Sequence, residues 1–118
     1  MRKAIYLLPL AFMLAGSAAS AHHSRSAFDQ SVSVEVRGEV VSFTYRSPHS
    51  YLVVDGIAYI GGVRQAQTVE RWRVESESVP ALTSMGVNAD TYKPGDSITV
   101  SGNPSRQEGF KFILLSAV

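Results

Sequence analysis

Apolar and polar residues alternate along residues 33–45, which is the pattern of a β-strand with one buried face. Val34, Val36 and Val40 fall on the same face of this strand. The alternation changes phase just after Val40, and Gly38 lies in the middle of the segment. Because a glycine and a phase change both favour a bend, we expect a long curved strand that takes part in both halves of a small barrel.

Four further segments have the composition of strands and are separated by turn signals. The expected strands span residues 50–60, 67–76, 97–101 and 110–118. The expected turns are Ser47-Pro48-His49, Gly61–Gln65, Tyr92–Asp96 and Gly102–Ser105. In the third strand, Val69, Trp72 and Val74 supply the bulk, and we expect the Trp72 ring to be buried.

One short segment, residues 79–85, has the signals of a helix rather than a strand. Ser78 is placed to cap it, Pro80 fits its first turn, and Gly86 fits its end. Five strands with one helix between the third and the fourth is the element order of the OB-fold.

Residues 33–118 are therefore predicted to form an all-β domain, a small five-stranded OB-like Greek-key barrel with one short helix between strands three and four. Another small all-β barrel or sandwich is the alternative.

Residues 1–21 have the three parts of a secretory signal peptide. Arg2 and Lys3 are the positive part, and residues 4–15 form an apolar run that is too short to be a permanent membrane anchor. Ala19-Ser20-Ala21 fits the small-residue cleavage pattern. We therefore expect a periplasmic or secreted protein.

Cleavage after Ser20 or after Ala21 would leave a polar segment, residues 22–32, ahead of the barrel. We expect this segment to be an extended N-terminal arm that is pinned by Phe28, one of its few apolar residues. The exact cleavage position matters because it decides which residue carries the new amino group.

Charge and cysteine content exclude several classes of protein. Loss of Arg2 and Lys3 lowers the number of basic residues from 11 to 9 against 10 acidic residues, so the processed chain is close to neutral. No basic patch stands out, which argues against binding of nucleic acid. The chain has no cysteine, so neither a disulfide nor a lipid-modified N-terminal cysteine is available.

The chain resembles a family of small exported bacterial proteins of unknown function, because several short motifs occur in the same order. These motifs are Ala21-His22-His23-Ser24, Gly38-Glu39-Val40, Ser47-Pro48-His49, Trp72-Arg73-Val74-Glu75, Lys93–Asp96 and Val100-Ser101-Gly102. At position 47 the chain has serine where the family usually has asparagine. The resemblance implies export and an OB-like fold, and it implies no activity.

The three histidines, His22, His23 and His49, are the candidate metal ligands. Cleavage before His22 would let its amino group and imidazole chelate one ion. Cleavage one residue earlier would place His23 third, where the amine, two backbone nitrogens and the imidazole can form a square-planar site. Cu(II) and Ni(II) favour such nitrogen-rich sites. Solvated histidines that bind no metal are the alternative interpretation.

Other residues give weaker signals. Glu75 and Glu77 are two apart and are expected to lie on a solvated sheet edge. Serines beside histidines do not amount to a hydrolase site, because no nucleophile elbow is present, and we expect no catalytic residues. The aromatic residues could form a binding face or could simply pack in the core and at the barrel rim: Tyr45, Tyr51, Tyr59 and Trp72.

Two functional hypotheses follow from the sequence. The first is a periplasmic accessory protein that binds Cu(II), or less readily Zn(II) or Ni(II), through its N-terminal histidines, with His49 as a further ligand. The second is a non-catalytic OB-like module that binds a periplasmic protein, a peptide or a glycan.

Overall fold

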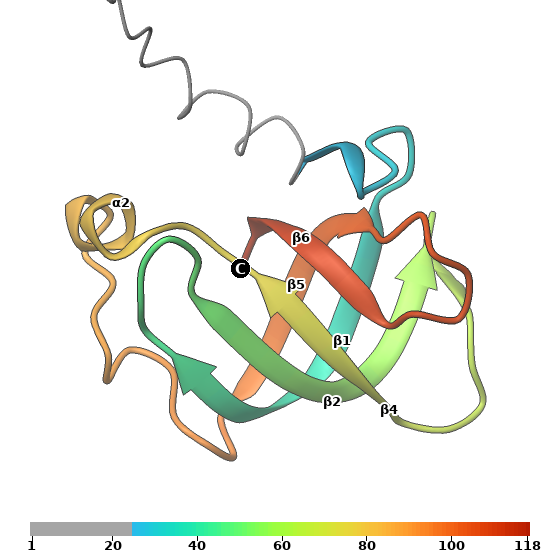
Figure 1. The fold of residues 1–118 in the computed structure, drawn as a ribbon. Coiled ribbons are helices and arrows are strands. Elements are labelled where there is room, and N and C mark those ends of the chain that lie inside the picture. Colours follow the sequence, from blue (N-terminus) through green and yellow to red (C-terminus); the bar gives the residue numbers. More distant parts are fainter. Residues whose placement is uncertain (1–24) are drawn as a thin grey trace, which may run out of the picture.

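The computed structural model describes residues 25–118, and the predicted signal peptide, His22 and His23 lie outside the described residues. The described part contains six strands and one short helix (Figure 1). They are β1 (Val34–Thr44), β2 (Tyr51–Ile60), β3 (Val63–Arg64), β4 (Glu70–Glu75), α2 (Val79–Ser84), β5 (Ser97–Pro104) and β6 (Phe112–Ala117). No helix among residues 25–118 has the length and apolar character needed to cross a membrane.

Five of the strands close into a barrel in the order β1-β5-β6-β4-β2, and β2 pairs back with β1. All of these pairings are antiparallel except that of β4 with β6. The two-residue strand β3 only extends the end of β2. Helix α2 lies between β4 and β5. These are the third and fourth strands that the sequence predicted, so the helix is where it was expected. The structure therefore confirms the all-β, OB-like barrel.

The first strand bends where the sequence pattern changes phase. The register of β1 against β2 shifts between Val40 and Ser42. Gly38 lies opposite Gly56, and a Cβ atom on Gly38 would overlap the carbonyl oxygen of Asp55. A glycine is required here because the two strands approach each other closely, which lets β1 curve and pair with both β2 and β5.

The core consists of inward-facing residues from all five strands of the barrel. It contains Val34, Val36, Val40, Leu52, Val54, Ala58, Trp72, Val74, Ile98, Val100 and Ile113. Trp72 and Val74 are buried as predicted. The prediction for Val69 was wrong: its side chain is 64% exposed, because β4 begins only at Glu70 and Val69 belongs to the preceding loop.

The predicted turn at Gly102–Ser105 was also wrong. Strand β5 continues to Pro104, and Gly102 pairs with Leu115 of β6. A Cβ atom on Gly102 would overlap the carbonyl oxygen of Leu114, so this glycine permits close strand packing instead of a turn. The chain reverses later, in the segment 105–111.

Helix α2 is fastened to the corner that joins β1 to β2. The Ser47 hydroxyl accepts a hydrogen bond of 3.1 Å from the backbone N–H of Val79, at the start of the helix. Ser78 occupies the cap position, but its side chain makes no capping hydrogen bond. At the other end of the helix, the Tyr45 hydroxyl lies 2.6 Å from the Thr83 hydroxyl. The corner and the helix are therefore one connected unit.

Replacement Ser47→Ala should lower the free energy of unfolding by about 1 kcal/mol, because the first helical N–H would lose its acceptor. Ser78→Ala is the matched control and should change stability by less than about 0.5 kcal/mol, since that hydroxyl makes no cap. Urea denaturation followed by circular dichroism measures both values. A larger loss for Ser78→Ala than for Ser47→Ala would contradict this assignment.

Candidate metal site at the His49 corner

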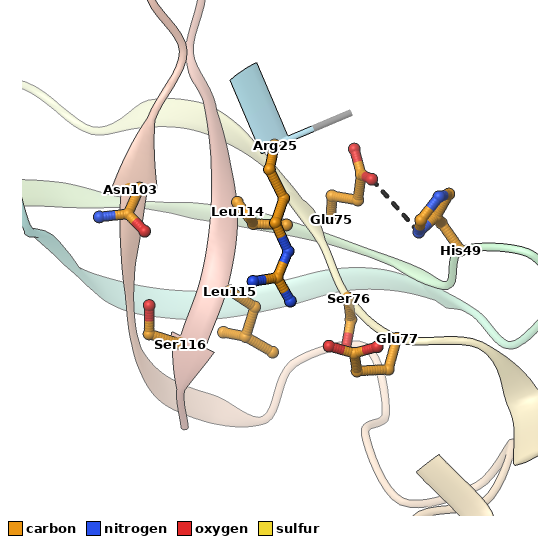
Figure 2. A pocket seen from close by; sticks show the side chains of 9 residues that line it. All are labelled: Arg25, His49, Glu75, Ser76, Glu77, Asn103, Leu114, Leu115 and Ser116. Atoms are coloured by element: carbon orange, nitrogen blue, oxygen red, sulfur yellow. Dashed lines mark ion pairs between the residues drawn. The ribbon is translucent and has the colours of Figure 1, made fainter. Parts of the chain in front are cut away.

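His49 lies at the corner between β1 and β2 and faces the last residue of β4. Its Nδ1 is 3.3 Å from the Oε1 of Glu75 (Figure 2). The Glu75 side chain is only 7% exposed, whereas that of His49 is 38% exposed. One side of the imidazole is thus held by a buried carboxylate while part of the ring stays accessible.

The burial of Glu75 corrects the sequence interpretation of a solvated edge. Glu75 pairs with Tyr51 on one side and with Leu114 on the other, so it lies inside the sheet and not at its edge. Glu77 lies beyond the end of β4 and is exposed, as expected. A buried carboxylate is costly unless it has polar partners, which makes its pairing with His49 informative.

The N-terminal arm packs against the segment that joins β5 to β6. The backbone N–H of Asp29 donates to the carbonyl of Pro104 at 2.8 Å, and the N–H of Arg106 donates to the carbonyl of Ala27 at 2.9 Å. Phe28, the residue expected to pin the arm, is 2% exposed, and its ring centroid lies 5.1 Å from that of Phe112. The arm is therefore fixed to the barrel by backbone bonds and a buried ring.

Within the arm, Asp29 forms a local turn with Ser31. The hydroxyl and the backbone N–H of Ser31 both donate to one carboxylate oxygen of Asp29, at 2.6 and 3.0 Å. These bonds lower the pKa of Asp29 below its usual value, because they stabilise the charged carboxylate.

This packing brings the beginning of the described chain to the His49 corner. A cavity of about 340 Å³ is lined by Arg25 together with His49 and Glu75 (Figure 2). Glu77 and Leu114 also line the cavity. Arg25 and His49 are 24 positions apart in sequence, so their place on one cavity depends on the path of the arm across the barrel.

The predicted ligands are only partly within the described chain. His49 has a defined place, and His22 and His23 lie outside the described residues. Among residues 25–118 there is no group of three histidine, cysteine, aspartate or glutamate side chains that could hold a metal ion. The described part of the site supplies one candidate ligand, the His49 imidazole, with the Glu75 carboxylate beside it.

The sequence reasoning missed Glu75 as a partner of His49. The only available signal was the order of the two motifs, Ser47-Pro48-His49 and Trp72-Arg73-Val74-Glu75. Their contact follows from the register of β2 against β4, which aligns Tyr51 with Glu75 and cannot be obtained from either motif alone.

The four aromatic residues considered as a binding face do not share one surface. Trp72 lies inside the barrel. The Tyr45 hydroxyl bonds to the helix region, and Tyr59 packs under the guanidinium of Arg37, whose Cζ is 4.2 Å from the ring centroid. Tyr51 stacks with Arg73 at 4.1 Å on the outside of the sheet.

Comparison with known proteins gives a family and no activity. No curated protein and no solved structure matches the chain. A family described only as being of unknown function, DUF6152, matches residues 11–111, which is most of the chain. The chain belongs to the DUF6152 family.

Proposed function

We propose that the protein is an exported accessory protein that binds one Cu(II) ion through its processed N-terminus, with His49 as a ligand from the barrel. The observation that carries the proposal is the cavity shared by Arg25, where the described chain begins, and His49. If the arm pointed away from the His49 corner, the N-terminus and His49 could not bind the same ion.

The short spacing between the N-terminal histidines and Arg25 supports a site that combines them with His49. Arg25 follows His23 by two residues and His22 by three. Each residue spans at most about 3.6 Å, so the Cα atoms of these histidines are within about 7 and 11 Å of that of Arg25 in any conformation. This short spacing keeps the N-terminal nitrogens near Arg25, which lines the same cavity as His49, and so supports a common ion.

The contact of 3.3 Å between His49 Nδ1 and the Glu75 carboxylate supports a role for His49 as a ligand. A histidine that binds a metal through one ring nitrogen commonly uses the other to bond a carboxylate, which fixes the ring and raises its basicity. Here Glu75 faces Nδ1, so Nε2 is the nitrogen available to an ion. Glu75 and Glu77 also offset the positive charge of Arg25 beside the cavity.

The chemistry of the donors favours Cu(II). An amine, imidazoles and backbone nitrogens form the nitrogen-rich, tetragonal environment that Cu(II) and Ni(II) prefer, and Cu(II) binds more tightly in the general order of divalent metals. Export, inferred from the charged, apolar and small-residue parts of residues 1–21, would place this site outside the cytoplasm.

Protein isolated from the cell envelope should begin at His22 or Ala21 and should bind one Cu(II) with a nitrogen-rich electron paramagnetic resonance spectrum. One extra residue before the native N-terminus should weaken binding by about tenfold or more, because the amine is displaced from the chelate. The double variant His22→Ala/His23→Ala should show a similar loss.

Native copper affinity in both the extended protein and the double variant would refute the N-terminal chelate. Recovery of a full-length, unprocessed chain as the main species would refute export instead. The two parts of the proposal can therefore fail separately.

A further inference from the structure

A second cavity is lined by residues where β1 begins and β2 ends. This end of the barrel lies opposite α2 (Figure 1). The cavity has a volume of about 230 Å³. Its floor is made by Val34, Ala58 and Trp72, and its other side by the segment 105–111 with Phe110. It is far from His49, which lies beyond the opposite end of β2.

The indole of Trp72 is the unusual group in this cavity. Its side chain is 6% exposed, and its Nε1–H is buried without a hydrogen-bond partner in the part of the chain that the structure describes. Buried donors are nearly always paired, so this one calls for an acceptor. The cavity is much larger than the roughly 10–15 Å³ that a single water needs, so it has room for a larger molecule.

The remaining groups around the cavity define which molecule fits. The ammonium of Lys111 lies 5.4 Å from the Trp72 ring centroid and 3.6 Å from a carboxylate oxygen of Glu70. Amides and a further carboxylate also line the cavity: Gln65, Gln107 and Glu108. The site therefore offers donors and acceptors together with both signs of charge.

This mixture disfavours three classes of ligand. The carboxylates of Glu70 and Glu108 would repel an anion. The Lys111 ammonium already occupies the place beside the Glu70 carboxylate and the Trp72 ring that a cation would take. A purely apolar molecule would leave the Trp72 N–H unpaired and would desolvate the charged rim. What remains is a neutral molecule with several hydroxyl groups, since each hydroxyl can both donate and accept.

We propose that this cavity binds a single neutral pyranose sugar. Its apolar ring face packs against Phe110, which is 49% exposed, and one of its oxygens accepts the Trp72 N–H. Since Nε1 is shielded from solvent, the sugar reaches it only when residues 107–110 shift. Residues 107–110 are exposed, and the N–H groups of Gln107 and Phe110 bond to Ser105 and Gln107 within the same connection, so this shift leaves the bonds to the arm in place.

Trp72 is the only tryptophan of the chain, so it reports directly on its own cavity. Methyl α-glucopyranoside, methyl β-galactopyranoside and N-acetylglucosamine are titrated against the processed protein. We expect a saturable shift of the single indole N–H resonance, and of the tryptophan emission, with at least one of these sugars at about millimolar concentration. Glucuronate and cyclohexanol, as anionic and apolar controls, should produce no saturable shift.

Two variants test the contacts. Phe110→Ala should weaken sugar binding about tenfold, and Trp72→Phe, followed by calorimetry, should do the same while keeping an aromatic ring in the core. Val69→Ala is the control, because Val69 is exposed and lies outside the cavity. His49→Ala should leave the sugar response unchanged, which separates this proposal from the copper site.

The proposal is overturned if none of the three sugars shifts the indole resonance, or if glucuronate or cyclohexanol shifts it as strongly as the best sugar. It is also overturned if Phe110→Ala binds that sugar with native affinity. This last test remains decisive even if Trp72→Phe fails to fold.

Discussion

Replacement Trp72→Ala should lower the free energy of unfolding by about 3–5 kcal/mol, a large fraction of the stability of a domain of this size. The ring comes from the inner face of β4, opposite Val54 of β2, and it is 6% exposed. No neighbouring strand can move into the vacated space, because Trp72 is held between β2 and β6 in a closed barrel. Urea denaturation followed by circular dichroism measures the loss without relying on tryptophan emission.

Val69→Ala is the matched control from the same stretch of sequence. Its side chain is 64% exposed, so the change should alter stability by less than about 0.5 kcal/mol. A Trp72→Ala protein that unfolds at nearly the native urea concentration would show that the ring does not belong to the core.

Replacement Glu75→Gln should weaken Cu(II) binding by about 10- to 100-fold, the usual effect of removing a carboxylate that orients a ligating histidine. The amide keeps the shape of the side chain but loses the charge that faces His49 Nδ1. His49→Ala should weaken binding at least as much and should also remove one nitrogen from the electron paramagnetic resonance spectrum. Isothermal titration of the processed variants measures the affinities.

Glu77→Gln is the control for this prediction, because Glu77 lines the same cavity but is exposed, and Figure 2 shows no ion pair between it and His49. It removes the same charge two residues further along the chain. Equal losses of affinity for Glu75→Gln and Glu77→Gln would mean that only the general negative charge matters, and the orienting role of Glu75 would be wrong.

Much of the barrel could be predicted because strands and helix are specified by local patterns. The period-two alternation located β1, and the sequence around Pro80 and Gly86 located α2. The structural role of a glycine could not be predicted from the sequence alone, since glycines occur both in turns and where two strands approach closely. Gly61 and Gly62 form a turn with positive φ, whereas Gly102 allows β5 and β6 to approach.

The candidate site could be predicted only in part, because it depends on contacts between distant segments. His49 was identifiable from its residue type and its place after Pro48. The partnership with Glu75 required the register of β2 and β4, and the approach of Arg25 required the bonds between the arm and the β5–β6 connection. Local periodicity contains neither piece of information.

The most direct test of the account is to locate the metal by nuclear magnetic resonance. Cu(II) is paramagnetic, so one equivalent added to the processed, ¹⁵N-labelled protein broadens the amide signals nearest to it. We expect loss of signals from His49 and its neighbours and from Glu75–Glu77, together with those of the arm around Arg25. Broadening confined to the arm, with the His49 and Glu75 signals still sharp, would contradict a site shared between the N-terminus and the barrel.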